Sequence, residues 1–274
     1  MCEFKRVLPE RDDFVDVAAG WDFTLCLDDK GVVFGCGSNT FGQLGLGDQV
    51  KNVCELTKLD IKEKVIKMAA GMRHSLFLLE DGSLCACGSG KKGQLCDTEK
   101  ANLHVIKHIK LEKKAIDIKA GQNFSIVIFD DGTFTAYGED KYGQVSKINQ
   151  LLKKNPSNDC NILYSTNVKQ IEVGWTHILI LLKNGRLEAF GRQDYGQINC
   201  TEAQNIVFTQ ISSGYEHCLA ISDSQDLYSW GWNEHGNCGL GHTENVLTPT
   251  KVLETETVIK CFAGSGHSFA LVKT

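Results

Sequence analysis

The amino-acid sequence predicts an all-β fold, a β-propeller built from four-stranded blades. Three observations predict this class: a set of glycines recurs along the chain, the segments around these glycines alternate in the manner of strands, and no helical periodicity is present. The composition agrees, because 27 glycines stand against three prolines, a ratio that favours many tight turns between short elements.

Each repeat is defined by three glycines at constant spacing. The first glycine, which we call the anchor, is followed by a second glycine 17 residues later and a third glycine five residues after that. Five copies keep this spacing, and a sixth anchor begins a partial unit; the anchors are Gly20, Gly71, Gly121, Gly174, Gly214 and Gly264. They lie 51, 50, 53, 40 and 50 residues apart. We therefore predict about five and a half units in a single propeller domain spanning residues 1–274.

Four strands follow in order within a unit. A strand of small residues such as IKMAA (66–70) precedes the anchor, and an apolar strand such as SLFLL (75–79) comes after it. A tight turn such as EDG (80–82) leads to a third strand, for which LYSWG (227–231) is an example, and the following loop ends in Gly-Gln. The fourth strand is expected in the variable linker, as at VCELTKL (53–59) and TPTKVL (248–253).

The segment 147–167 is the longest linker, and the sequence predicts an irregular, solvated loop there. An arm that grips a partner is the alternative for this segment.

The stretch YSWGWNEHGNCG (228–239) places bulky side chains among glycines. Trp230 occupies the strand position that Cys36, Cys87, Tyr137 and Phe190 hold in the other units, which indicates packing between blades. Trp232 follows the second glycine, where the other units have polar residues, so it is expected to be exposed and fits a structural or a binding role equally well.

Bulk composition narrows the class of partner and the compartment. The net charge of −5 gives no basic field for nucleic acid, and no apolar run approaches the length of a membrane span. Several of the 12 cysteines lie in strand-like runs, as small buried residues do in a reducing compartment. We expect a cytoplasmic protein with the nucleus as a second location, without nucleic-acid or membrane partners.

The motifs give no sign of catalytic, cofactor or metal chemistry. The sequence contains no Cys-x-x-Cys pair and no Gly-x-x-x-x-Gly-Lys loop. Four histidines, at 74, 177, 217 and 267, share one repeat position with Phe23 and Phe124, which favours a structural role over a metal or catalytic one. The sequence thus predicts a protein that is not an enzyme and has no catalytic, cofactor-binding or metal-binding residues.

The repeat Gly-x-x-His-Ser…Asp-Gly…Trp-Gly-x-Asn-x-x-Gly-Gln-Leu-Gly resembles that of the regulator of chromosome condensation superfamily, which are seven-bladed propellers, and CGSNTFGQLGLG (36–47) is its most specific copy. Some motifs occur in only one of the repeats and resemble one subgroup in particular, among them GWTH (174–177), FGRQDYGQ (190–197) and SWGWNEHGNCG (229–239). This subgroup contains the secretion-regulating guanine nucleotide exchange factor-like proteins and the yeast alpha-tubulin suppressor, also called a killer-toxin-insensitivity protein. Compared with the subgroup, about one and a half units have no counterpart before Gly20. We therefore expect a shortened N-terminus and a natural form with further residues there.

The resemblance implies two functions. The first is a non-enzymatic regulator that binds the small zinc protein of diphthamide synthesis, which also supports Elongator-dependent modification of wobble uridine in tRNA. The second is guanine nucleotide exchange on a small GTPase of the Ran class. The first is favoured, because the chain is acidic and shows neither an inserted β-wedge nor a basic tail.

The remaining chemistry is a binding surface. In the predicted topology, the turn after each anchor and the loop after the second glycine lie on one face, and that face carries residue types enriched in interface hot spots. The partner-binding candidates are Trp21, Asp22, Arg73, Trp175, Arg192, Tyr195, Tyr215, Glu216, Trp232, Glu234 and His235. The alternative for Trp21 and Trp175 is that they plug a central channel.

Overall fold

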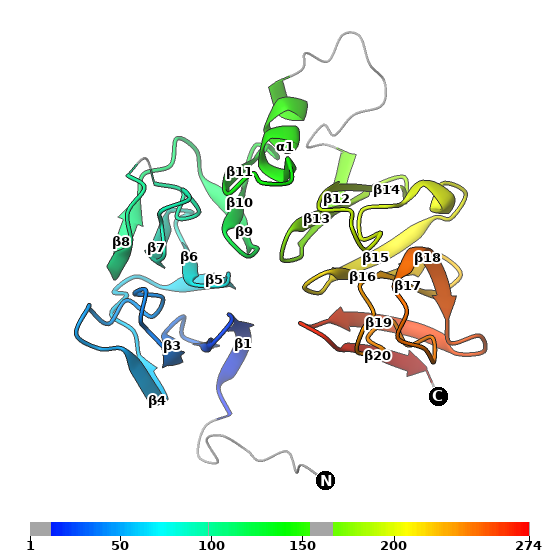
Figure 1. The fold of residues 1–274 in the computed structure, drawn as a ribbon. Coiled ribbons are helices and arrows are strands. Elements are labelled where there is room, and N and C mark those ends of the chain that lie inside the picture. Colours follow the sequence, from blue (N-terminus) through cyan, green and yellow to red (C-terminus); the bar gives the residue numbers. More distant parts are fainter. Residues whose placement is uncertain (1–11, 98, 154–166, 274) are drawn as a thin grey trace. The chain divides into compact units, whose positions relative to one another are not determined.

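The computed structural model describes residues 12–97, 99–153 and 167–273 (Figure 1). These residues form 20 strands, one α-helix and one 3-10 helix. The chain divides into two compact units, each of which contains more than one of the repeats. The first unit is Met1–Ile118 and the second unit is Lys119–Thr274.

The first unit contains two four-stranded antiparallel sheets, in the orders β1-β2-β3-β4 and β5-β6-β7-β8. The strands of the first sheet are β1 (Phe14–Ala19), β2 (Phe23–Asp28), β3 (Val33–Ser38) and β4 (Asn52–Lys58). Those of the second are β5 (Val65–Ala70), β6 (His74–Leu79), β7 (Leu84–Gly88) and β8 (Leu103–Ile109). Each sheet is a meander of consecutive strands, as the repeat predicts.

The next sheet has the order β9-β10-β11, with β9 (Ala115–Ala120), β10 (Phe124–Phe129) and β11 (Phe134–Gly138). The helix α1 (Gln144–Lys153) follows it and lies beside β11 (Figure 1). The second unit then contains β12-β13-β14, β15-β16-β17-β18 and the two-stranded β19-β20. Their bounds are β12 (Val168–Val173), β13 (His177–Leu182), β14 (Leu187–Gly191), η2 (Thr201–Ala203), β15 (Phe208–Ser213), β16 (His217–Ser222), β17 (Leu227–Gly231), β18 (Val246–Val252), β19 (Thr257–Ala263) and β20 (Ser268–Lys273).

The glycine spacing has a steric cause, which Gly214 and Gly231 illustrate. A Cβ atom on the anchor Gly214 would overlap the imidazole ring of His217, three residues later. Gly231 adopts φ +108°, and a Cβ atom there would stand 2.5 Å from the carbonyl oxygen of Glu216. The next residue, Trp232, donates its N–H to that same carbonyl at 2.8 Å. The 17-residue spacing therefore keeps the two ends of a hairpin in register.

The core of each unit consists of side chains packed between successive sheets. In the second unit, Leu179 and Leu181 of β13 pack with Phe208 and Ile211 of β15, and Trp230 of β17 joins this cluster with no exposed surface. The indole Nε1 of Trp230 donates to the main-chain oxygen of Gln197 at 3.1 Å. The predicted packing role of Trp230 is confirmed.

A fourth strand is present in three of the sheets that the structure describes. The expected fourth strands at 53–59 and 248–253 are confirmed as β4 and β18. Among the described residues the sheet β12-β13-β14 has three strands, because its repeat is 40 residues long where the others span 50 or more, and the segment with η2 follows β14 without pairing with it. The expectation of four strands in each unit was therefore wrong for this sheet.

The expectation of an irregular loop from residue 147 was also wrong, since α1 covers 144–153. The buried Ile148 attaches this helix to the core of the second unit. Asn149 bonds the main chain of Ala136 on β11 with both ends of its amide, at 3.0 and 2.8 Å. The helix thus occupies the edge that a fourth strand covers elsewhere. Residues 154–166 of the predicted linker lie outside the described residues.

Two sheets keep large apolar side chains exposed. On β19-β20, Phe262, Phe269 and Leu271 are exposed by 53%, 61% and 53%. The residue of β6 that matches Phe269 in the repeat, Leu76, has no exposed surface. On β1, Val17 is 63% exposed.

Candidate functional site: the unit-2 loop face

The buried glutamine of the loop after β14 ties one sheet to the next. In the second unit, Gln197 is fully buried, and its Oε1 accepts the main-chain N–H of Tyr195 at 3.0 Å. Its Nε2 donates to a carboxylate oxygen of Glu216 at 2.7 Å. Its main-chain oxygen accepts from Trp230 and, at 3.5 Å, from the thiol of Cys218. Gln197 therefore fixes both the loop that carries Tyr195 and the turn that carries Glu216.

Part of this device recurs in the first unit, where the main-chain oxygen again accepts from the next sheet but the side-chain amide bonds the anchor turn of its own sheet. Gln43 accepts the N–H of Phe41 at 2.9 Å and donates to Asp22 at 3.2 Å, while its main-chain oxygen accepts the hydroxyl of Ser75 at 2.6 Å. The Gly-Gln dipeptide is visible in the sequence, but no role of the glutamine was predicted from it. The signal was available, because the chain places a glutamine or asparagine after the third glycine of every complete unit: Gln43, Gln94, Gln144, Gln197 and Asn237.

Successive anchor turns of the second unit are bonded to one another. The N–H of Gln122 donates to the main-chain oxygen of Trp175 at 2.9 Å, and the N–H of Trp175 donates to that of Tyr215 at 2.8 Å. The rings of Trp175 and Tyr215 stack with centroids 4.0 Å apart and planes 12° apart, and both side chains are half-buried. Stacking fixes both rings in place.

A polar group lies beside this aromatic pair. The carboxylate of Glu216 is buried and accepts the hydroxyl of Thr176 at 2.7 Å, and the Nη1 of Arg192 lies 3.8 Å from it. Burial raises the pKa of Glu216, while the hydrogen bonds from Thr176 and Gln197 and the charge of Arg192 act in the opposite direction. Glu216 therefore holds the loops together from beneath the surface, and we correct its expected position from a displayed residue to a supporting one.

Arg192 and Tyr195 form the next part of the face. The Nε of Arg192 donates to Asp194 at 2.7 Å, and its guanidinium lies 4.7 Å from the centroid of the Tyr195 ring. Both Arg192 and Tyr195 are half-buried, and Asp194 is exposed. The side chains are ordered by one another, which lowers the entropy that a partner must remove on binding.

Trp232 and His235 continue the face toward the turn of the last anchor. Their rings meet edge to face with centroids 4.9 Å apart. A Cβ atom on Gly266 would lie 3.4 Å from the His235 ring and 3.7 Å from the Trp232 ring, so the pair packs on that turn. Trp232 is half-buried rather than fully exposed, whereas His235 and Glu234 are exposed. We call Trp175, Arg192, Tyr195, Tyr215, Trp232, Glu234 and His235 the unit-2 loop face.

The other three candidates belong to the first unit. Trp21 is 52% exposed, and its N–H lies 3.4 Å from the main-chain oxygen of Met72. Asp22 is exposed and bonded to Gln43, and the guanidinium of Arg73 lies 4.4 Å from the ring centroid of Phe41. These residues repeat the arrangement of the second unit, with the loop of one sheet lying on the anchor turn of the next.

The repeat histidines are structural where they are buried. His74, His177 and His217 have no exposed surface, and burial lowers the pKa of His177 to about 3 and that of His217 to about 4. His177 lies 3.1 Å from the thiol of Cys218, and His217 lies 3.0 Å from the hydroxyl of Ser268. Their rings fill the space beside the anchor glycines, which a phenylalanine ring also does at Phe23.

The described ranges contain neither a metal-ligand cluster nor a membrane-spanning helix. Residues 12–97, 99–153 and 167–273 contain no group of three or more His, Cys, Asp or Glu side chains placed to hold a metal ion. No helix in these ranges has the length and apolar content of a membrane span.

The glycine-anchored sheets and their loops define the class: a β-propeller of the protein-interaction type. The chain belongs to the RCC1-like domain family, whose model matches residues 3–270. It is 32% identical to the mouse protein named secretion-regulating guanine nucleotide exchange factor, over 99% of this chain and 66% of that protein. It is 30% identical to an RCC1 repeat-containing protein of Schizosaccharomyces pombe, over 85% of this chain and 65% of the relative. The chain thus spans about two thirds of the length of these relatives.

Solved structures show the same fold. Human WBSCR16 superposes with a TM-score of 0.76 at 22% identity, over 95% of this chain and 72% of that one. Prp20p of Saccharomyces cerevisiae, solved in a study of its binding to Gsp1p and histones, superposes with a TM-score of 0.71 at 19% identity, over 94% of this chain and 82% of that one. The predicted family and fold class are confirmed, and these comparisons indicate no family of catalytic enzymes.

Proposed function

We propose that this protein is a non-enzymatic regulator that binds a protein partner through the unit-2 loop face. The observation that carries the proposal is the run of half-buried aromatic side chains, from Trp175 and Tyr215 to Tyr195 and Trp232, on loops that buried hydrogen bonds hold in place. Tryptophan, tyrosine and arginine dominate interface hot spots, and rings that are already ordered lose little entropy on binding.

The partner that we favour is the small zinc protein of diphthamide synthesis, with a supporting role in Elongator-dependent tRNA modification. Support comes from the motifs GWTH (174–177), FGRQDYGQ (190–197) and SWGWNEHGNCG (229–239), which resemble the subgroup with this role. These motifs supply most residues of the unit-2 loop face. The surface offers the mixture of aromatic, cationic and acidic groups that suits a folded protein. We place this function in the cytoplasm, with the nucleus as a second compartment.

Nucleotide exchange on a small GTPase is the second candidate. Its support is the name of the mouse relative, a secretion-regulating guanine nucleotide exchange factor, and the study of Gsp1p binding by the similar yeast protein Prp20p. A direct comparison separates the two candidates. The purified zinc protein and a purified Ran-class GTPase, each from the organism of this chain, are titrated in a calorimeter, and release of labelled GDP from the GTPase is followed with and without this protein. Binding of the zinc protein without accelerated GDP release supports the first candidate, and the opposite pattern supports the second.

The Trp232→Ala variant tests the surface itself. We expect it to weaken the complex by about 2 kcal/mol or more, roughly a 30-fold rise in Kd, because a half-buried aromatic anchor is removed. Val105→Ala is the control, since Val105 is 60% exposed and lies in the first unit. A dissociation constant equal to that of the parent protein would remove Trp232 from the contact surface.

A further inference from the structure

Among the residues that the structure describes, no strand pairs with the outer edge of β14. In the sheets that have four strands, β4, β8 and β18 pair with the third strands β3, β7 and β17. In the sheet β12-β13-β14, β14 is the last strand. Its residues Leu187–Phe190 are all half-buried, whereas every residue of β7 is buried. An open strand edge presents unpaired main-chain groups and is a template for another strand.

The ladder between β13 and β14 identifies the groups on this edge. At the two ends of the ladder, Leu182 N donates to Arg186 O and Arg192 N donates to Thr176 O, so Arg186 and Arg192 direct their main-chain groups toward β13. In an antiparallel pair, successive residues of a strand direct these groups alternately toward the partner strand and away from it. The main-chain groups of Leu187 and Ala189 therefore point outward. The residue that matches Ala189 in β17, Ser229, pairs with Thr250 of β18.

The matching residue in β11 is Ala136, and both of its outward groups are bonded by Asn149. The chain thus covers this register position in two ways, with a strand or with a side-chain amide. In the part of the chain that the structure describes, no group bonds Ala189 from the outer side.

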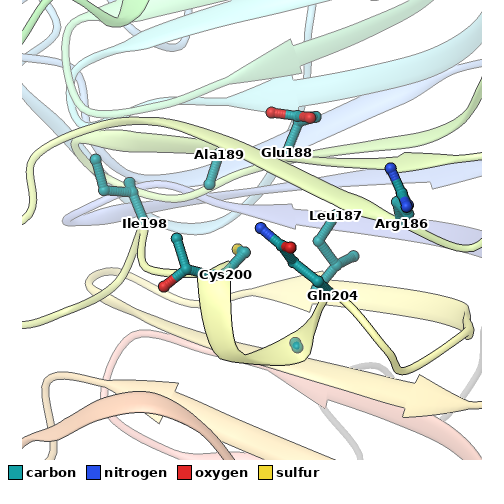
Figure 2. A pocket seen from close by; sticks show the side chains of 9 residues that line it. Arg186, Leu187, Glu188, Ala189, Ile198, Cys200 and Gln204 are labelled. Carbon is teal, nitrogen blue, oxygen red and sulfur yellow. The ribbon is translucent and has the colours of Figure 1, made fainter. Parts of the chain in front are cut away.

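A pocket of about 240 Å³ lies along this edge. One wall is Arg186–Ala189 of β14, and the other is the segment of η2, with Ile198, Cys200 and Gln204 (Figure 2). The segment is attached to the next sheet, because Asn199 donates to the main-chain oxygen of Leu247 at 3.1 Å. The volume is below the range of about 300–1,000 Å³ that small-molecule sites occupy. Burial raises the pKa of the Cys200 thiol to about 12, so the pocket holds no reactive thiolate.

Glu188 gives the edge a charge preference. It matches Tyr228 of β17, which pairs directly with Lys251 of β18. A strand added to β14 in the same register would place one side chain directly opposite Glu188, with Arg186 diagonal to it. Directly opposed side chains have Cβ atoms about 5 Å apart and diagonal ones about 7–8 Å, so the charge of Glu188 outweighs that of Arg186. Burial of Glu188, which raises its pKa, makes a cationic neighbour more favourable still.

We propose that the β14 edge binds an extended segment of a partner protein as an antiparallel fourth strand, with a basic side chain opposite Glu188. Main-chain bonds to Leu187 and Ala189 supply affinity, and the basic residue fixes the register, as in other cases of strand addition. The proposal does not depend on the unit-2 loop face or on the identity of its partner.

A peptide from this chain provides the probe. Residues 245–253, NVLTPTKVL, contain β18. If this peptide pairs with β14 in the register in which β18 pairs with β17, Lys251 lies opposite Glu188. We expect saturable binding of the capped peptide to the full chain, with slower hydrogen exchange and shifted NMR signals at the amides of Leu187 and Ala189. The peptide with glutamate in place of Lys251 should bind at least five-fold more weakly.

Two variants keep the test independent of folding. Glu188→Lys should reverse the preference between the two peptides, an outcome that loss of structure cannot produce. Ala189→Pro, which removes an outward donor that an edge strand can lose, should weaken binding at least ten-fold. No binding at 1 mM peptide, binding without protection at Ala189, or an unchanged preference in Glu188→Lys would overturn the proposal. Protection of the same amides in the free protein, together with a dimer in sedimentation, would assign the edge to a second copy and also overturn it.

Discussion

Replacing Gln197 by alanine tests whether the buried amide holds the unit-2 loop face together. The change removes the bond from Tyr195 N to Gln197 Oε1 at 3.0 Å and the bond from Gln197 Nε2 to Glu216 at 2.7 Å. It leaves the main-chain oxygen of residue 197 in place as the acceptor for Trp230. The perturbation is therefore confined to the side chain of residue 197: it removes two hydrogen bonds and the buried atoms that make them.

The expected loss follows from the burial of the two partners. Tyr195 is half-buried, so water can replace the lost acceptor of its N–H, and the cost is about 1 kcal/mol. Glu216 is buried, and a hydrogen bond to a charged group contributes about 1.5–3 kcal/mol. Glu216 keeps Thr176 as a partner, which places the second contribution near 2 kcal/mol. We expect Gln197→Ala to lower the free energy of unfolding by about 3 kcal/mol.

Urea unfolding followed by tryptophan fluorescence measures this loss. Trp175, Trp230 and Trp232 all lie in the second unit, so the signal reports mainly on that unit. Gln193→Ala is the matched control, because Gln193 is an exposed residue of the same loop and should change stability by less than about 0.5 kcal/mol. A loss below about 1 kcal/mol, or one equal to that of the control, would refute a supporting role for the Gln197 amide.

Three further predictions follow from the same structure. His177 stays neutral in the folded protein down to about pH 3, while an unfolded histidine takes up a proton near pH 6.5. Stability should therefore fall by about 1.4 kcal/mol per pH unit for this group as the pH drops below 6.5, and His177→Phe should flatten that part of a urea midpoint curve; an unchanged slope would contradict the assignment. Asn149→Leu should cost about 1–3 kcal/mol and speed hydrogen exchange at Ala136, whereas unchanged exchange would show that α1 does not cap this edge. Gly214→Ala should cost more than about 2 kcal/mol in thermal or urea unfolding, because its Cβ overlaps the His217 ring; a neutral effect would refute the steric account of the anchors.

The sequence predicted the elements that depend on local patterning. The strands around each anchor, the fourth strands β4 and β18, and the burial of Trp230 all follow from alternation and from repeat position. It failed for α1, where the helix depends on a tertiary contact: Ile148 enters the core and Asn149 replaces a strand. The 40-residue spacing between Gly174 and Gly214 is the signal in the sequence for the missing fourth strand after β14.

The loops that form the candidate surface could be predicted from the sequence. Which of their residues are exposed and which are buried as supports could not. Repeat position brings Arg192, Tyr195 and Trp232 to the same kind of loop, and the structure places them as expected. Repeat position does not reveal that Glu216 lies beneath the surface, because its burial depends on Gln197, 19 residues earlier in the chain. The glutamine recurs at a fixed repeat position, but the partner of its amide does not: Gln43 bonds Asp22 and Gln197 bonds Glu216.

The bridges formed by these main-chain oxygens join residues that leave the ribosome at different times. The main-chain oxygen of Gln43 accepts from a hydroxyl 32 residues later in the chain, that of Gln197 from a thiol 21 residues later, and that of Asn237 from a hydroxyl 31 residues later. At about 5–20 residues per second, a ribosome delivers each missing donor roughly one to six seconds after the loop that needs it. Each of these three loops therefore emerges before its donor, and a pause in translation just after the loop would prolong the exposure of its carbonyl to water and to other chains.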